Sequence, residues 1–180
     1  SGVLNRNKNS FKGIQAVGIL NLNDSLSGFQ VAGFGNMNRK KTSGTQFAGV
    51  ANITGGTVNG IQIAGIFNYA KQVNGSQLGL INIADSVNGW NLGLINIILK
   101  GKHSIDFSTN ELNTFSISYK SGTNKMYNIF QAGGNPFEGS KSLHIGYGLG
   151  SEILIKKRWA FVQEAIASTI HAGNWNDQNI

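Results

Sequence analysis

The 180-residue sequence contains no cysteine, a single proline and few acidic residues. Without cysteine the chain forms no disulfide and no thiolate metal site. No stretch of 18 apolar residues is present, so no transmembrane helix is predicted, and no signal peptide is recognised. Eight Asp and Glu residues stand against 15 Lys and Arg, which gives a formal net charge of +7. That balance raises the question of an anionic partner.

The basic residues are concentrated in expected turns and in the C-terminal part. Examples are Arg39-Lys40-Lys41, Lys100, Lys102 and Lys156-Lys157-Arg158. Because no helix or aromatic platform accompanies these residues, we interpret them as solvated turn charges. Nucleic acid is therefore not expected as a partner.

Glycine is abundant, with 25 residues, about twice the usual share of roughly 7%. Many of the glycines belong to a motif that is repeated six times, at intervals of 14 to 16 residues. The copies begin at Gly13, Gly28, Gly44, Gly60, Gly75 and Gly89. The first residues, Gly2-Val3-Leu4-Asn5, match the end of such a copy. We therefore expect the chain to start within a repeat and to be a fragment of a longer protein.

Each copy carries two side-chain amides at fixed places. The first lies two residues after the opening glycine, and the second usually lies three residues after an inner glycine such as Gly33. Amides have both a donor and an acceptor, so stacked copies can bond one another in a continuous row. We predict two structural amide ladders, in preference to a ligand-binding role: Gln15, Gln30, Gln46, Gln62, Gln77 and Asn91 in one, and Asn21, Asn36, Asn52, Asn68, Asn82 and Asn96 in the other.

A period of 15 or 16 residues is too short for helical repeats and matches one turn of a β-solenoid. Each coil is expected to hold two or three short strands, such as residues 29–32 and 34–37, with Gly33 at the corner. A meander with one strand per copy would have turns that differ pairwise, whereas every copy here ends in a similar polar corner. In a stack, two apolar ladders form: Ile19, Phe34, Val50 and Ile66 in one, and Ala16, Val31, Phe47, Ile63 and Leu78 in the other.

After residue 100 the repeat stops and segments with period-two alternation follow. Polar turns separate these segments, which predicts antiparallel strands joined by hairpins. A helix would also fit residues 159–170 by length, but the alternation of Trp159, Phe161 and Gln163 favours a strand. The segments cover residues 104–107, 115–119, 126–130, 143–149 and 159 to about 171.

The predicted fold is all-β, with a parallel β-solenoid of about six coils in residues 1–100 and an antiparallel β-meander in residues 101–180. An open β-stack exposes unpaired strand edges that recruit other chains. The meander is therefore expected either to cap the solenoid or to be part of a barrel that continues beyond Ile180. A bacterial membrane barrel needs at least eight strands, whereas about five are predicted here.

The motif Gly-Φ-Gln-Φ-Ala-Gly-Φ-x-Asn, in which Φ is apolar, is complete at residues 60–68, and a related run occupies residues 79–89. Both resemble surface-repeat proteins of Gram-negative bacterial envelopes, of the type found in Bacteroidetes and Leptospira. In that family the repeats precede a β-rich part that looks like the start of an outer-membrane barrel, and residues 147–152 followed by Trp159 are similar in style. The resemblance implies a place at the outer membrane or cell surface and supplies no catalytic residues.

The spacing of the residues indicates neither an enzymatic site nor a metal site. The three histidines, His103, His144 and His171, have no ligand spacing among them, and the acidic residues are scattered. The segment Gly148-Leu149-Gly150 lacks the rest of a phosphate-binding motif. The sequence therefore predicts a non-enzymatic protein with no cofactor and no metal.

Two functions remain open. The first is a structural or adhesive module of the bacterial cell envelope, whose solenoid is a rigid scaffold that contacts other envelope proteins or the outer membrane. The second is a glycan- or peptidoglycan-associated binding module that uses exposed amides and aromatics. Because a saccharide platform needs aromatics aligned on one face, and the variable second position is aromatic in only two copies, the first function is favoured. The candidate aromatics are Phe29, Tyr69, Trp90 and Trp175.

Overall fold

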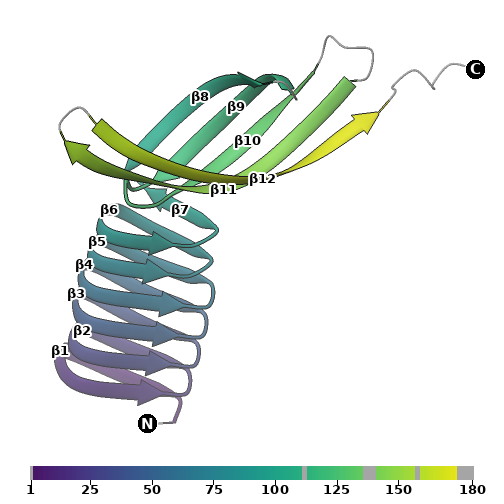
Figure 1. Cartoon of the computed structure of the whole chain (residues 1–180). Helices are drawn as coiled ribbons and strands as arrows, with labels where there is room; N and C mark the ends of the chain where they lie inside the picture. Colours follow the sequence, from purple (N-terminus) through teal and green to yellow (C-terminus); the bar gives the residue numbers. More distant parts are fainter. Residues whose placement is uncertain (1, 111–112, 136–140, 157–158, 174–180) are drawn as a thin grey trace, which may run out of the picture. The chain divides into compact units, whose positions relative to one another are not determined.

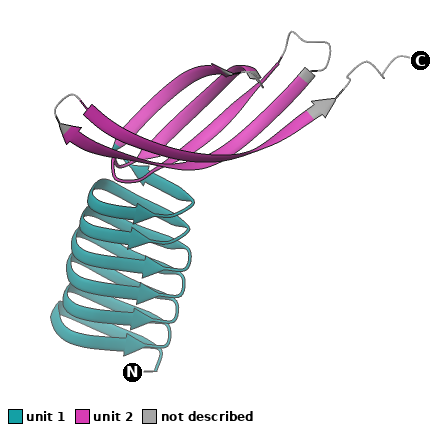
Figure 2. Ribbon diagram, viewed as in Figure 1, with its two compact units in different colours: residues 1–101 teal, residues 102–180 magenta. Residues whose placement is uncertain are grey.

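The computed structural model describes residues 2–110, 113–135, 141–156 and 159–173. These residues form twelve strands (Figure 1). The chain divides into two compact units, residues 1–101 and 102–180 (Figure 2). Trp175, Ile180 and the Lys157-Arg158 pair of the sequence analysis lie outside the described residues. No helix in the described part of the chain is long and apolar enough to cross a membrane.

Unit 1 is a parallel β-solenoid. Its strands pair in chain order and in parallel, so that each coil lies on the coil before it. The parallel stack predicted for the repeats is therefore confirmed, and the alternative of a meander with one strand per copy is wrong. The register places the opening glycine of each copy opposite that of the next, as Gly44 lies opposite Gly60. The strands are β1 (Leu4–Val17), β2 (Leu20–Ala32), β3 (Gly35–Ala48), β4 (Ala51–Ala64), β5 (Phe67–Leu78), β6 (Ile81–Leu92) and β7 (Ile95–Ile98).

Two kinds of corner shape each coil. The chain bends sharply at the inner glycine, between β2 and β3 at Gly33-Phe34, as predicted. The polar segment forms a broader corner inside each long strand, and the register shifts there, for example between Asn23 and Ser25. Such bulges absorb the one-residue difference between copies of 15 and 16 residues.

The opening glycines allow the coils to stack closely. Gly60 has a φ of 142°, in the region that favours glycine. A Cβ atom built there would lie 2.0 Å from the carbonyl oxygen of Gly44 in the coil before it. Glycine recurs at this position because both the backbone conformation and the space exclude a side chain.

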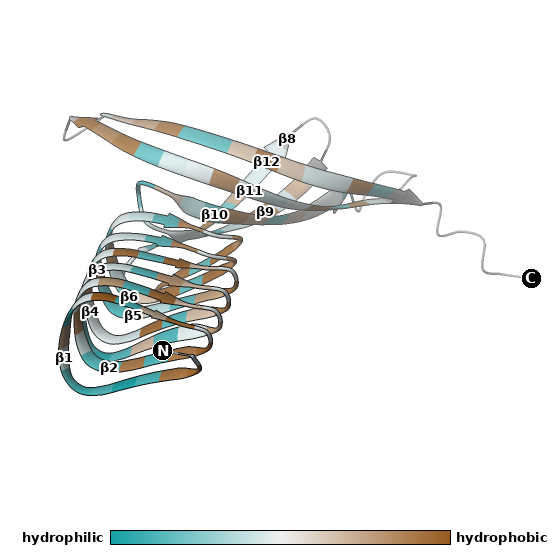
Figure 3. Cartoon of the chain, turned by 90° about the horizontal axis from the view of Figure 1, so that it is seen from below, coloured by the Kyte–Doolittle hydropathy of each residue, from teal (hydrophilic) through white to brown (hydrophobic). Residues whose placement is uncertain are grey.

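Many apolar side chains of the coils point outward, while others, such as Val58 and Val73, are buried inside. The predicted apolar ladders do line up in register, but Phe34 and Ile66 are 52% and 46% exposed. Figure 3 shows hydrophobic segments stacked at one end of the coils. The amides alternate with these residues along the strands and therefore point inward.

Unit 2 is an antiparallel sheet in the order β12-β11-β10-β9-β8. Residues 159–170 lie within a strand rather than a helix, as the alternation predicted. Consecutive strands are neighbours throughout, which is the meander predicted from the polar turns. The strands are β8 (Lys102–Asn110), β9 (Asn113–Gly122), β10 (Tyr127–Asn135), β11 (Lys141–Lys156) and β12 (Trp159–Gly173).

Candidate interaction surfaces

The asparagine column lies inside the solenoid and runs through all of its coils. Asn21 Nδ2 donates to Asn36 Oδ1 at 2.8 Å, and the same bond recurs from Asn5 to Asn96. Each asparagine from Asn21 to Asn82 also donates to a main-chain carbonyl at the far end of its own strand, such as that of Ile63, which Asn52 reaches at 2.7 Å. These asparagines therefore join adjacent coils and close their own coil as well.

The glutamine column is buried beside the asparagine column and ends one rung earlier than predicted. Asn91 occupies the sixth rung with a side chain one methylene shorter. Its amide atoms, and Gln77 Oε1, have no hydrogen-bond partner within the described part of the chain. The bonds of the column, at 2.8 to 3.0 Å, run from Gln30 to Gln15, from Gln46 to Gln30, from Gln62 to Gln46 and from Gln77 to Gln62.

A third polar column, which the sequence analysis missed, fills the first coils. Asn23 is buried and donates to Gln15 Oε1 at 2.8 Å. Asn38 donates in the same way to Gln30 Oε1 at 3.1 Å, and Thr54 takes the next rung. The signal in the sequence is an amide two residues after the second amide, at Asn23 and Asn38.

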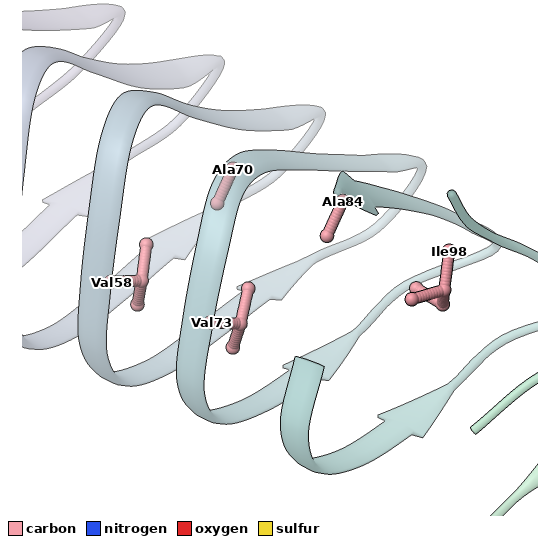
Figure 4. Close-up of a cluster of buried hydrophobic side chains, with 5 residues drawn as sticks. All are labelled: Val58, Ala70, Val73, Ala84 and Ile98. Atoms are coloured by element: carbon pink, nitrogen blue, oxygen red, sulfur yellow. The ribbon is translucent and has the colours of Figure 1, made fainter. Parts of the chain in front are cut away.

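The interior becomes apolar in the later coils (Figure 4). The third column continues there as Ala70, Ala84 and Ile98, next to Val58 and Val73. All five side chains are at most 1% exposed and form one cluster. The inside of the solenoid is thus packed with its own side chains, and the amides there bond to the protein itself except at Asn91, whose amide has no partner among the described residues.

The outside of the inner-glycine corner carries an apolar wall. We define it as two outward columns, one just before the corner and one at the corner. The members named below are at least 37% exposed, whereas Val50 and Ile63 of the same columns are half-buried. Soluble monomers rarely expose contiguous apolar patches larger than a few hundred Å². The members are Val31, Phe47, Leu78 and Leu92 in the first column, and Ile19, Phe34, Ile66, Leu80 and Leu94 in the second.

The broad polar corner carries positive charge in the first and third coils. We call this group the basic corner; its side chains are exposed. Asp24 lies among them, with its carboxylate 3.4 Å from Lys40 Nζ and 4.0 Å from the Arg39 guanidinium. The members are Arg6, Lys8, Arg39, Lys40 and Lys41.

The two faces of the sheet in unit 2 differ in polarity. One face exposes Phe107, Phe115 and Ile145, whose exposed fractions lie between 48% and 69%. On the other face Ser116 and Tyr127 are fully buried. We call these the apolar face and the polar face of the sheet.

Ion pairs across the polar face show that the sheet curls toward it. Lys120 on β9 lies 2.6 Å from Glu164 on β12, and Lys102 on β8 lies 2.5 Å from Glu152 on β11. Each pair is separated by two intervening strands, a distance of roughly 14 Å in a flat sheet. Curling brings these long side chains together over the ring of Tyr127, whose centroid is 4.2 Å from Lys102 Nζ.

The charges on the polar face shift one another's protonation. Burial would raise the pKa of Glu164, but hydrogen bonds from Lys120 and Tyr127 outweigh it and the pKa is lowered. Burial would lower the pKa of Lys120, but Asp106 and Glu164 raise it. Burial, followed by the bond to Glu164, raises the pKa of Tyr127. This cluster of side chains is therefore most stable when Lys120 is charged, Tyr127 is neutral and Glu164 is ionised.

The histidines do not form a catalytic arrangement in the described residues. His144 is buried with Nε2 at 3.5 Å from Ser116 Oγ, across Gly133, which has no side chain to intervene. Its Nδ1 has no hydrogen-bond partner in the described part, so no third group orients the imidazole. His103 contacts Tyr119. Nor do the described residues include a group of three or more His, Asp or Glu that could hold a metal ion.

No protein-family model, no curated protein and no solved structure matches this chain.

Proposed function

We propose that this chain is a non-enzymatic structural module of a Gram-negative cell envelope, placed at the outer membrane or cell surface. In this proposal the solenoid is a rigid scaffold, and the apolar wall is its contact surface for other envelope proteins or the outer membrane. The observation that supports the proposal best is the distribution of side chains in the coils. The amides bond one another inside, so the apolar residues are left outside to make contacts.

Rigidity follows from the bonds between coils. Neighbouring coils pair along most of their length, and the asparagine and glutamine columns add side-chain bonds at each step. Bending the stack would stretch the main-chain and side-chain bonds together. A scaffold that holds a contact surface in a fixed shape is the use to which such a stack is suited.

The glycan-binding alternative has less support. Its candidate aromatics Phe29 and Trp90 occupy the same outward column, but Thr45, Ile61 and Ser76 lie between them in the stack. No two aromatics of that column are therefore adjacent in the described coils. A glycan array with the purified chain would test this alternative, and specific binding to one glycan class would favour it.

Detergent dependence tests the proposed scaffold. We expect the purified chain to self-associate or to bind outer-membrane vesicles, and mild detergent to release it, as measured by light scattering after size exclusion. A Phe34→Ser/Ile66→Ser/Leu80→Ser variant of the apolar wall should lose much of this behaviour. A matched control, Ile14→Ser/Ile61→Ser/Ile97→Ser, changes exposed apolar residues outside the wall. A monodisperse wild-type chain that binds no envelope fraction without detergent would contradict the proposal.

A further inference from the structure

The basic corner lies beside a groove that combines positive charge with apolar side chains. The groove has a volume of about 350 Å³, and its lining includes Arg6, Lys8 and Arg39 together with Leu22 and Met37. In the strand register Arg6, Leu22 and Met37 occupy one outward column, so a cation and two apolar residues follow one another up the stack.

The charge of this corner is largely uncompensated. Five basic side chains face one carboxylate, that of Asp24, which lies within 4.0 Å of Lys40 and Arg39 only. The same corner of the next coil is Gly55-Gly56-Thr57, which carries no charge. The positive charge is thus concentrated in the first and third coils, whereas this corner of the later coils holds Lys71 and Asp85, one charge of each sign.

The apolar part of the groove decides which anion fits best. Met37 is 45% exposed, and it continues the apolar surface of the coils up to the edge of the basic corner. A soluble anion needs no apolar lining, and single-stranded nucleic acid is bound mainly on aromatic side chains, none of which is among the described residues that line the groove. A phosphate headgroup joined to acyl chains has both parts of the required chemistry.

We propose that the basic corner and its groove bind the phosphate headgroups of an anionic lipid, so that the first three coils lie against an anionic membrane surface. Arg39, Lys40 and Lys41 contact the phosphates, while Met37 and Leu22 contact the upper part of the acyl chains. Arg and Lys stems can lie along apolar surface while their charged ends reach the headgroups. This inference names the partner of one solenoid surface and rests on the proposed envelope function.

Vesicle flotation tests the inference. We expect the chain to bind phosphatidylcholine vesicles that contain about 30 mol% phosphatidylglycerol at least tenfold more tightly than vesicles of phosphatidylcholine alone, and about 0.5 M NaCl to remove most of the difference. An Arg39→Gln/Lys40→Gln/Lys41→Gln variant should bind the anionic vesicles on the order of a hundredfold more weakly at low salt.

A control variant, Lys71→Gln/Lys100→Gln/Lys125→Gln, makes the same change in net charge at exposed residues outside the basic corner. It should bind within about threefold of wild type, since these residues do not contact the headgroups. Equal losses in the two variants would overturn the inference, because only net charge would then matter. A Met37→Ser variant should weaken binding by about threefold to fivefold at both salt concentrations, as loss of an apolar contact does.

Other outcomes separate this inference from the proposed function. Equal binding of the wild type to both kinds of vesicle would overturn the lipid-phosphate site and leave an apolar envelope scaffold standing. Equally tight binding to single-stranded DNA, lost in the basic-corner variant, would indicate a general polyanion site and also overturn the inference. Absence of binding to any vesicle and to envelope proteins would contradict both proposals.

Discussion

The solenoid and the sheet both bury polar side chains, but they use different chemistry. In the solenoid the buried groups are neutral, and most amides of the two columns bond the same residue type one coil away. In the sheet the groups are charged, and Lys120 bonds Asp106 and Glu164 from different strands. A repeated neutral bond can be copied from coil to coil, whereas an ionic cluster forms at a single place.

The solenoid and the sheet also differ in how deeply their polar side chains are buried. Gln46, Gln62 and Asn52 are 0% exposed, because a satisfied amide carries no net charge to desolvate. The side chains of Lys120, Glu164 and Asp106 keep 14%, 25% and 46% of their surface exposed. Fully burying an ion costs more than a neutral hydrogen bond does. The solenoid can thus be dry inside, while the polar face of the sheet keeps contact with solvent.

A side chain at the opening glycine of a coil should have the largest effect. In Gly60→Val the Cβ would lie 2.0 Å from a main-chain oxygen at a φ of 142°, so the coils must separate. We expect a loss of more than about 4 kcal/mol and failure of unit 1 to fold, measured by denaturant unfolding. Gly2→Ala, with no atom within 4 Å, is the control.

A side chain added at a glycine of the sheet should lower the stability less. In Gly150→Ala the new Cβ meets the ring of Tyr127 instead of main chain, so the ring has to shift and weaken its bond to Glu164. We expect a loss of about 1–3 kcal/mol. Equal losses for Gly60→Val and Gly150→Ala would show that close stacking of coils is not what requires glycine.

Removal of one amide from the glutamine column should have the second largest effect on stability, after Gly60→Val. In Gln62→Leu the volume is kept, but Gln77 Nε2 loses its acceptor inside the solenoid. We expect a loss of about 2–4 kcal/mol in chemical denaturation, because a buried donor is left unsatisfied. Gln72→Leu, at an exposed corner, should change stability by less than about 0.5 kcal/mol. A neutral result for Gln62→Leu would mean that the column does not stabilise the stack.

Removal of a charge from the sheet should lower the stability less than removal of an amide from the glutamine column. Glu164→Gln keeps the shape of the side chain but removes the ionic partner of Lys120, which retains Asp106. Since these groups are partly exposed, we expect a loss of about 1 kcal/mol, seen as a lower midpoint in thermal unfolding of unit 2. A cost as large as that of Gln62→Leu would remove the contrast between neutral and charged interiors.

The same residue gives the sheet a dependence on pH. The pKa of Glu164 is lowered in the folded chain, so its stabilising contribution is present above the unfolded value, near 4.5, and is lost as the pH falls through the folded value. The difference in melting temperature between wild type and Glu164→Gln should therefore shrink between pH 6 and pH 3. The amide columns carry no titratable group, and Gln62→Leu should show the same deficit across this range.

The smallest effect on stability is expected on the apolar face of the sheet. Ile145 is 62% exposed, so Ile145→Ser should change the unfolding free energy by less than about 0.5 kcal/mol. Self-association without detergent should nevertheless fall, as measured by light scattering. Substitution of Ser118, on the polar face, by Ala is the comparison, and it should leave association unchanged.

The repeat made the architecture predictable. Equal spacing of Gly44 and Gly60 requires equivalent surroundings, and a parallel stack is the arrangement that provides them. The strands of unit 2 followed from alternation in the same way, including residues 159–170. Both inferences need only local patterns, which a single sequence contains.

Other features could not be deduced from local patterns. Alternation shows that Gln62 and Ile63 point to opposite sides of a strand, but not which side is inside. The narrow interior decides this, since the amides find hydrogen-bond partners only in the coils next to them. The pairing of Lys120 with Glu164 depends on the curl of the sheet, and the groove at Met37 depends on the stacking of three strands.

The shared register of the coils makes their number adjustable. Deletion of residues 44–59 would remove one 16-residue period and bring Gly28 directly beneath Gly60, since both already face Gly44 from opposite sides. The main-chain ladder and both amide columns would rejoin like with like, and the solenoid would shorten by about 4.8 Å, one strand spacing. Evolution can thus tune the reach of this protein in fixed increments by gaining or losing whole copies, without redesigning either amide column.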